Sequence, residues 1–216
     1  MADDLILTAW RGHEGFATWL VERMKPRVVV DLGVDFGFSS FTFALAGAEM
    51  VYGVDSFEGD PEAGHRDTYS EVVRRQQELG IQNLSLIKGY FSEVAKTWDK
   101  PIDILHIDGR HRYEDVKEDY ELWRPFVRKG GIILLHDTCV FKEPYGVHRF
   151  FEEITEPKTS FNHSYGLGVV SDDPKLISKI NRVHMVRLVN HSQWQRVQRV
   201  WQRIRRRTIG IPEPRF

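Results

Sequence analysis

Hydrophobic runs alternate with amphipathic stretches along most of the chain. Short runs rich in β-branched residues predict five strands, at residues 27–32, 50–54, 84–88, 102–107 and 131–135. The intervening stretches have apolar residues at helical spacing and predict helices, at residues 15–24, 38–46, 68–79, 92–98, 113–127 and 147–154. Because the strand runs are apolar throughout, we expect helices to cover both faces of a parallel sheet.

Two further segments follow the last of these strands. Residues 161–170 predict an antiparallel hairpin at one edge of the sheet, and residues 192–207 predict a basic amphipathic helix. The predicted fold is therefore α/β, a Rossmann-like, doubly wound and mostly parallel sheet with a late antiparallel hairpin and a C-terminal basic helix. We expect one domain over residues 1–171. Residues 172–216 would form a helical extension that packs on this domain or on a second subunit, which would make a homodimer.

Composition excludes several classes of protein. The chain has 216 residues and a formal net charge of -1, so its overall charge does not predict nucleic-acid binding. Its one cysteine, Cys139, cannot form an internal disulfide. The acidic N-terminus lacks the basic and apolar regions of a secretion signal, and no apolar run approaches the roughly 18 residues of a membrane span. We therefore expect a soluble cytoplasmic protein that does not span a membrane.

A glycine-containing loop follows the first predicted strand. It starts at Asp31, places glycines at Gly33 and Gly37, and ends at Ser39 in the next predicted helix. Open α/β sheets bind ligands at this point, and glycines let the backbone approach the ligand closely. The spacing lacks the G-x-G-x-x-G fingerprint of dinucleotide sites, so it favours a nucleoside without a pyrophosphate. Asp31 could receive the cationic amino end of an amino-acid-like cofactor, although a plain strand-to-helix turn would look similar.

A second candidate binding segment lies at the end of the second strand. Asp55 stands about 20 residues beyond the glycine loop and is followed by Ser56 and Phe57. A carboxylate at this position can accept hydrogen bonds from both hydroxyls of a ribose. The alternative for Asp55 alone is a helix cap or a surface residue. Together, the loop and Asp55 predict a nucleoside site.

Acidic residues and histidines follow the fourth and fifth strands. Asp108, Gly109 and His111 come after the fourth strand, and His136 and Asp137 come after the fifth. These side chains should converge and could hold a divalent cation through oxygen and nitrogen. Alternatively, His111 or His136 could act as a general base without a metal. A structural hydrogen bond is the common role of a single histidine, but both histidines fall where such sheets bind ligands.

These segments together resemble a known family. The sequence is similar to class I S-adenosylmethionine-dependent methyltransferases and, more narrowly, to the methyltransferase family 24 group, which includes members encoded with or fused to glycosyltransferases. The resemblance covers roughly residues 10–171. Its most specific parts are the Asp-Gly-x-His-x-Tyr segment that begins at Asp108 and the His-Asp-Thr segment that begins at His136.

The resemblance implies a cofactor, a metal and a reaction. It places S-adenosylmethionine at the loop glycines, Ser39, Asp55 and the Asp108–Gly109 turn. It places Mg²⁺ or Mn²⁺ at Asp108 and Asp137, with His136 where some relatives have another acid. The expected reaction is O-methylation of a sugar, a glycan, another small polyol or a phenol, with Asp108, His111 and His136 as catalytic candidates. A nicotinamide-dependent oxidoreductase and a catalytically silent binding scaffold are the alternatives.

Overall fold

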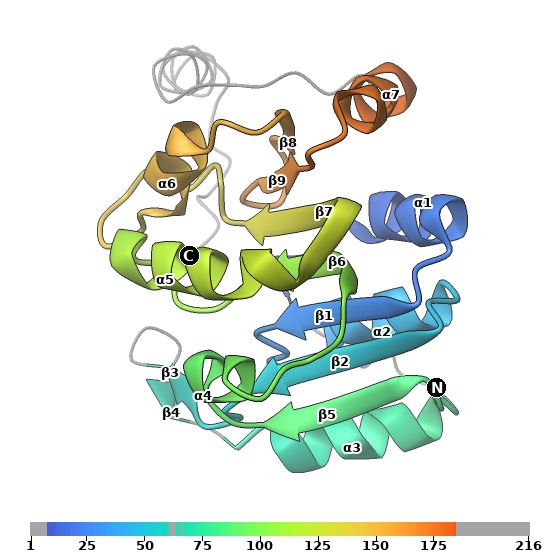
Figure 1. Ribbon diagram of the computed structural model, residues 1–216. Coiled ribbons are helices and arrows are strands. Elements are labelled where there is room, and N and C mark those ends of the chain that lie inside the picture. Colours follow the sequence, from blue (N-terminus) through green and yellow to red (C-terminus); the bar gives the residue numbers. More distant parts are fainter. Residues whose placement is uncertain (1–7, 61–63, 66, 185–216) are drawn as a thin grey trace, which may run out of the picture.

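The chain forms a seven-stranded sheet in a computed structural model that describes residues 8–60, 64–65 and 67–184 (Figure 1). The strand order is β5-β2-β1-β6-β7-β9-β8. The parallel strands are β1 (Val28–Leu32), β2 (Met50–Asp55), β5 (Leu84–Lys88), β6 (Ile102–Ile107) and β7 (Val127–His136). The predicted hairpin is also confirmed, because β9 (Leu167–Val170) is antiparallel to β7 and to β8 (Lys158–Phe161). A separate antiparallel pair joins β3 (Gly59–Asp60) and β4 (Gly64–His65).

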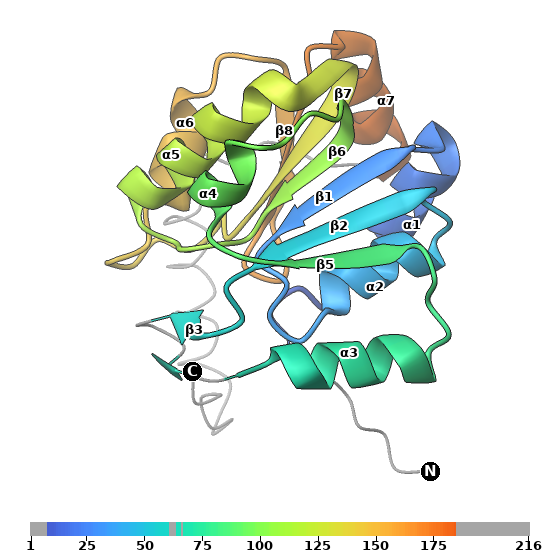
Figure 2. The same ribbon diagram turned by 60° about the horizontal axis from the view of Figure 1, so that its bottom comes forward.

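Helices cover both faces of the sheet, as the apolar strands predict (Figures 1 and 2). One face packs against α1 (Glu14–Met24), α2 (Phe38–Leu45), α3 (Tyr69–Glu78) and α7 (Pro174–His184). The other face packs against α4 (Phe91–Ala95), α5 (Tyr113–Trp123) and α6 (Val147–Glu153). Alternate strand residues supply the two core layers, so Val29 joins the first and Val30 joins the second. The Rossmann-like fold is therefore confirmed.

The helix predicted over residues 113–127 ends earlier than expected. The α-helix stops at Trp123, and a short 3-10 turn over Arg124–Phe126 leads directly into β7. Pro125 causes this early end, because its nitrogen has no hydrogen to donate to the helix. Gly130 and the glycine after it lie inside β7.

The start of the predicted C-terminal extension packs on the domain. Ile177 and Ile180 of α7 are buried in the first core layer, and the Thr159 hydroxyl donates a hydrogen bond to Asn181. The basic helix predicted at residues 192–207 lies outside the described residues, so the domain division and the homodimer stay predictions. Within the described ranges, no helix is both long and apolar enough to cross a membrane.

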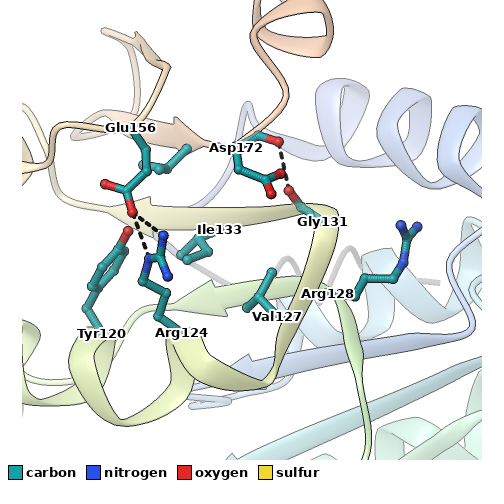
Figure 3. A pocket seen from close by; sticks show the side chains of 10 residues that line it. Tyr120, Arg124, Val127, Arg128, Gly131, Ile133, Glu156 and Asp172 are labelled. Atoms are coloured by element: carbon teal, nitrogen blue, oxygen red, sulfur yellow. Dashed lines mark hydrogen bonds and ion pairs between the residues drawn. The ribbon is translucent and has the colours of Figure 1, made fainter.

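A pocket lies between α5, the first half of β7 and the segment around Asp172 (Figure 3). Arg124 reaches across it and forms an ion pair with Glu156, and the Gly130 amide donates to Asp172. This pocket lies at the edge where the parallel strands begin. Arg128, which also lines the pocket, pairs with Asp103. The candidate residues lie at the opposite edge of the sheet.

Candidate functional site

The candidate side chains lie at the edge of the sheet where the parallel strands end. β1 is flanked by β2 and β6, and the chain winds outward in opposite directions from these neighbours. Open α/β sheets bind ligands at such a switch point. The Asp108 amide donates to the Leu32 carbonyl, and the Gly33 amide donates to the Val54 carbonyl. These bonds hold the loops after β1, β2 and β6 together in one rim.

The glycine loop needs its glycines for space as well as for conformation. Gly33 has φ +96°, and a Cβ atom there would lie 2.0 Å from the carbonyl oxygen of Asp108. Gly37 has φ +89°, and a Cβ atom there would lie 2.5 Å from the ring of Phe41. An L side chain rarely adopts such a φ, and a backbone oxygen cannot move aside easily. Gly33 therefore permits the close approach of the loop to the turn after β6.

Asp55 organises the same loop from the end of β2. Its carboxylate accepts hydrogen bonds from the amides of Val34 (2.8 Å) and Asp35 (3.0 Å), and also from the amide of Phe57 (2.7 Å). A carboxylate has about four acceptor positions, so three backbone bonds leave room for one more donor. The predicted role toward a ribose stays open, and Asp55 also shapes the backbone that would surround the nucleoside.

Asp31 does not present its carboxylate to the rim, which corrects the expectation that it receives a cationic group directly. The side chain is fully buried. It accepts hydrogen bonds from the hydroxyls of Ser39 (2.7 Å) and Ser40, and it pairs with His106 Nδ1 at 2.6 Å. A buried charge needs such donors in place of water. Asp31 and Ser39 can therefore influence a ligand only through the loop and the first turn of α2.

The side chains of the remaining cofactor candidates have contacts within the protein. The Phe57 ring is 1% exposed and packs edge-on against Tyr69, so it belongs to the core. The Ser56 hydroxyl accepts a hydrogen bond from the Glu58 amide. Gly109 lies under the ring of Phe91, where a Cβ atom would approach the ring to 2.5 Å. Ligand contacts by Ser56, Phe57 and Gly109 therefore stay predictions. The buried ring of Phe57 is poorly placed to contact a ligand.

His136 is engaged on both ring nitrogens. Nε2 lies 3.0 Å from the Ser164 carbonyl oxygen, which can only accept, so Nε2 carries a proton. Nδ1 faces carboxylate oxygens of Asp108 (3.2 Å) and Asp137 (3.5 Å). Burial alone would lower the pKa of His136, but these two charges raise it well above its usual value. The Ser164 carbonyl thus occupies Nε2, and Nδ1 points toward the two carboxylates. The predicted roles of His136 as a base and as a metal ligand stay predictions.

The sequence left open whether His111 or His136 is the general base, and the surroundings of His111 suit this role. Its Nδ1 lies 2.9 Å from a carboxylate oxygen of Asp137, and its side chain is 21% exposed. Its ring stacks on Tyr145 with a centroid separation of 4.8 Å and an interplanar angle of 6°. A carboxylate at Nδ1 places the proton on that nitrogen and the lone pair on Nε2. This pair has the arrangement of a general base held by an acid.

The same residues also fit a divalent cation. One ligand atom each from Asp108, His111 and Asp137 lie within 4.8 Å of one another. Two carboxylates and one imidazole suit Mn²⁺ better than Mg²⁺, which prefers oxygen ligands. This group contains two of the predicted ligands, Asp108 and Asp137, and adds His111, while His136 as a ligand stays a prediction. Asp137 adopts φ +62°, a strained conformation for a residue other than glycine, and such strain concentrates at functional sites.

Two segments at the rim were not predicted as part of the site. The first is the turn after β8, where Ser164 accepts hydrogen bonds from both His136 and His13. The second is Tyr145, which covers His111. His13 is fully buried, and burial together with the charge of His136 lowers its pKa to about 3. No local pattern marks Ser164 or Tyr145, because their partners lie far away in the sequence.

The fold and the rim define a Rossmann-like protein with a nucleoside-type loop and an acid–histidine cluster beside it. The comparisons place this protein in a family. A family model described as a methyltransferase domain, methyltransferase family 24, matches residues 30–138. The chain therefore belongs to methyltransferase family 24, and the predicted family membership is confirmed.

Two curated proteins are similar in sequence. The uncharacterized protein y4gI of Sinorhizobium fredii is 34% identical over 172 residues, which cover 76% of this chain and 19% of that protein. The uncharacterized protein R132 of Acanthamoeba polyphaga mimivirus is 40% identical over 60 residues, which cover 26% of this chain and 27% of that protein. The chain thus spans less than a third of the length of either relative.

Solved structures share the fold at low sequence identity. The O-methyltransferase from Bacillus cereus in complex with SAH (S-adenosylhomocysteine) has a TM-score of 0.59 and 15% identity, over 74% of this chain and 81% of that one. The O-methyltransferase TomG from Streptomyces achromogenes, in complex with SAM (S-adenosylmethionine), has a TM-score of 0.57 and 16% identity, over 78% and 83%. These likenesses confirm the methyltransferase-type fold.

Proposed function

We propose that this domain transfers a methyl group from SAM to a hydroxyl group of a sugar or another small polyol or phenol. The observation that carries the proposal is the His111–Asp137 pair, which stands on the same rim as the glycine loop and Asp55. Family membership supports methyl transfer, and the structural neighbours that are O-methyltransferases support oxygen as the acceptor atom. Fold alone does not decide the acceptor, so the acceptor class rests on the site.

The residues divide between binding the nucleoside and activating the acceptor. The loop from Gly33 to Gly37 and the carboxylate of Asp55 would surround the nucleoside. When bound, SAM supplies a methyl group already activated by its sulfonium, so the protein mainly has to orient the acceptor. His111 would take the proton of the acceptor hydroxyl on Nε2, while Asp137 holds the ring through Nδ1.

A cation is the alternative role for the same cluster. Asp108, His111 and Asp137 would hold Mn²⁺ or Mg²⁺, and the ion would lower the pKa of a coordinated acceptor hydroxyl. We favour the proton-acceptor role, because the Nδ1 atom of His111 already bonds to Asp137. Neutral hydroxyl acceptors suit this acidic rim better than anionic ones.

Two experiments test the proposal: calorimetry with SAH and with NADH, and a methyl-transfer assay. We expect heat from SAH and none from NADH, because the loop lacks the dinucleotide spacing. Labelled SAM would then be incubated with a methyl glycoside, a cyclic polyol and a catechol. We expect label in at least one of them. Absence of heat with both SAM and SAH would refute the proposal, and binding without transfer to any hydroxyl would favour the silent scaffold.

Replacement of Asp55 by alanine should weaken SAH binding about tenfold or more. The change leaves the amides of Val34 and Phe57 without their acceptor, at about 1–3 kcal/mol for each buried group, so the loop loses its shape. Asp103→Ala is the matched control. Asp103 accepts from the amides of Arg27 and Val28 where β1 begins, at the far edge of the sheet.

The two variants should lose stability to a similar extent, but only Asp55→Ala should change the SAH dissociation constant. Chemical unfolding and calorimetry measure the two quantities. Equal SAH affinity in both variants would show that Asp55 has no role at the nucleoside.

A further inference from the structure

Trp10 connects the start of the chain to the base of the nucleoside site. Its indole N–H donates a hydrogen bond of 3.0 Å to Nε2 of His106, which lies 96 positions later. The Trp10 side chain is almost fully buried and His106 is fully buried. Trp10 also packs edge-on against Phe38 and Phe43 of α2. Core packing explains the aromatic contacts, but it does not require a hydrogen bond to a histidine on β6.

This hydrogen bond determines which nitrogen of His106 carries the proton. An indole N–H can only donate, so Nε2 of His106 must present its lone pair. The proton is therefore on Nδ1, which lies 2.6 Å from Asp31 and donates to its carboxylate. Trp10 thus holds the His106 ring in the position and tautomer that Asp31 requires.

Asp31 connects His106 to the helix turn that follows the nucleoside loop. Its other carboxylate oxygen accepts the hydroxyls of Ser39 and Ser40, which lie in the first turn of α2. That turn follows Gly37 directly, so its position determines where the glycine loop ends. The chain of bonds therefore runs from Trp10 through His106 and Asp31 to α2, and every member is buried.

We propose that Trp10 is a positioning residue for the nucleoside cofactor, acting through His106 and Asp31 on the first turn of α2. The inference rests on the proposed function, because it assigns the loop to SAM and SAH. Without the indole N–H, the loop would occupy its binding shape for only part of the time. The apparent dissociation constant rises by the inverse of that fraction.

Trp10→Phe keeps an aromatic ring in the core and removes the N–H donor. The matched control is Trp123→Phe on the opposite face of the sheet. Trp123 is also fully buried, but its indole nitrogen has no hydrogen-bond partner among the described residues. We expect Trp10→Phe to raise the SAH dissociation constant about 3- to 10-fold, and Trp123→Phe to change it less than about twofold.

A double-variant cycle distinguishes positioning from general destabilisation. Ser40→Ala removes one end of the chain of bonds. If Trp10 acts through that chain, adding Trp10→Phe to Ser40→Ala should raise the dissociation constant less than about twofold further. A full 3- to 10-fold effect in the Ser40→Ala background would overturn the proposal, and so would wild-type SAH affinity in Trp10→Phe.

Wild-type protein provides a readout that does not depend on a variant folding. The Trp10 indole N–H should exchange with deuterium more slowly once SAH is bound, because binding selects the ordered loop. The Trp123 indole N–H serves as the internal control. If SAH binds and the exchange rate at Trp10 does not change, the positioning role is contradicted, but the proposed function is not. A wild-type protein that does not bind SAH would refute the proposed function as well, so the two failures are distinguishable.

Discussion

Gly33→Ala is expected to reduce SAH affinity on the order of 100-fold and to lower the free energy of unfolding by about 2–6 kcal/mol. The new Cβ atom would lie 2.0 Å from the carbonyl oxygen and 2.6 Å from the carbonyl carbon of Asp108. Both are backbone atoms, so the loop after β1 and the turn after β6 would have to separate. Calorimetry with SAH and denaturant unfolding measure the two effects.

Gly47→Ala is the matched control for this change. Gly47 has the same φ of +96°, but no heavy atom lies within 4 Å of the Cβ position. Alanine there suffers only the conformational strain, about 1–3 kcal/mol, and the nucleoside site is not touched. SAH affinity should therefore match the wild type in Gly47→Ala. If both variants bound SAH equally well, close approach at Gly33 would have no role in binding.

His111→Gln is expected to lower kcat/KM for methyl transfer by about 10²- to 10⁴-fold, while SAH affinity stays within about twofold. Glutamine can still bond to Asp137, but it cannot take a proton from the acceptor hydroxyl. The assay would use SAM and whichever acceptor the panel identifies. Undiminished transfer in this variant would exclude His111 as the base.

His184→Gln is a suitable control for this substitution, because His184 packs on Phe16 and Trp19 of α1. It should leave kcat/KM unchanged. Chelation of wild-type protein then separates the two roles of His111. A base without a metal predicts unchanged turnover in EDTA, whereas loss of turnover that Mn²⁺ restores would assign His111 to a cation with Asp108 and Asp137.

The sequence by itself determined the fold of this protein and the edge of the sheet that carries the candidate site. Apolar strand runs predicted the doubly wound sheet, because residues buried on both faces leave little room for polar positions. The placement of Asp55, Asp108 and Asp137 at neighbouring strand ends followed from the same pattern, since parallel strands end at one edge. The loop glycines predicted a close approach of the backbone to a ligand, and the structure adds that Gly33 closely approaches the turn after β6.

Only the tertiary structure decided how the polar groups at that edge pair. His111 and His136 look equivalent in sequence, but in the structure His136 bonds to the Ser164 carbonyl in the turn after β8, whereas His111 pairs with Asp137. Asp31 looked available for a ligand until His106 and two serines were found around it. Hydrogen-bond partners depend on which distant segments meet in space, and hydrophobic periodicity carries no information about that choice.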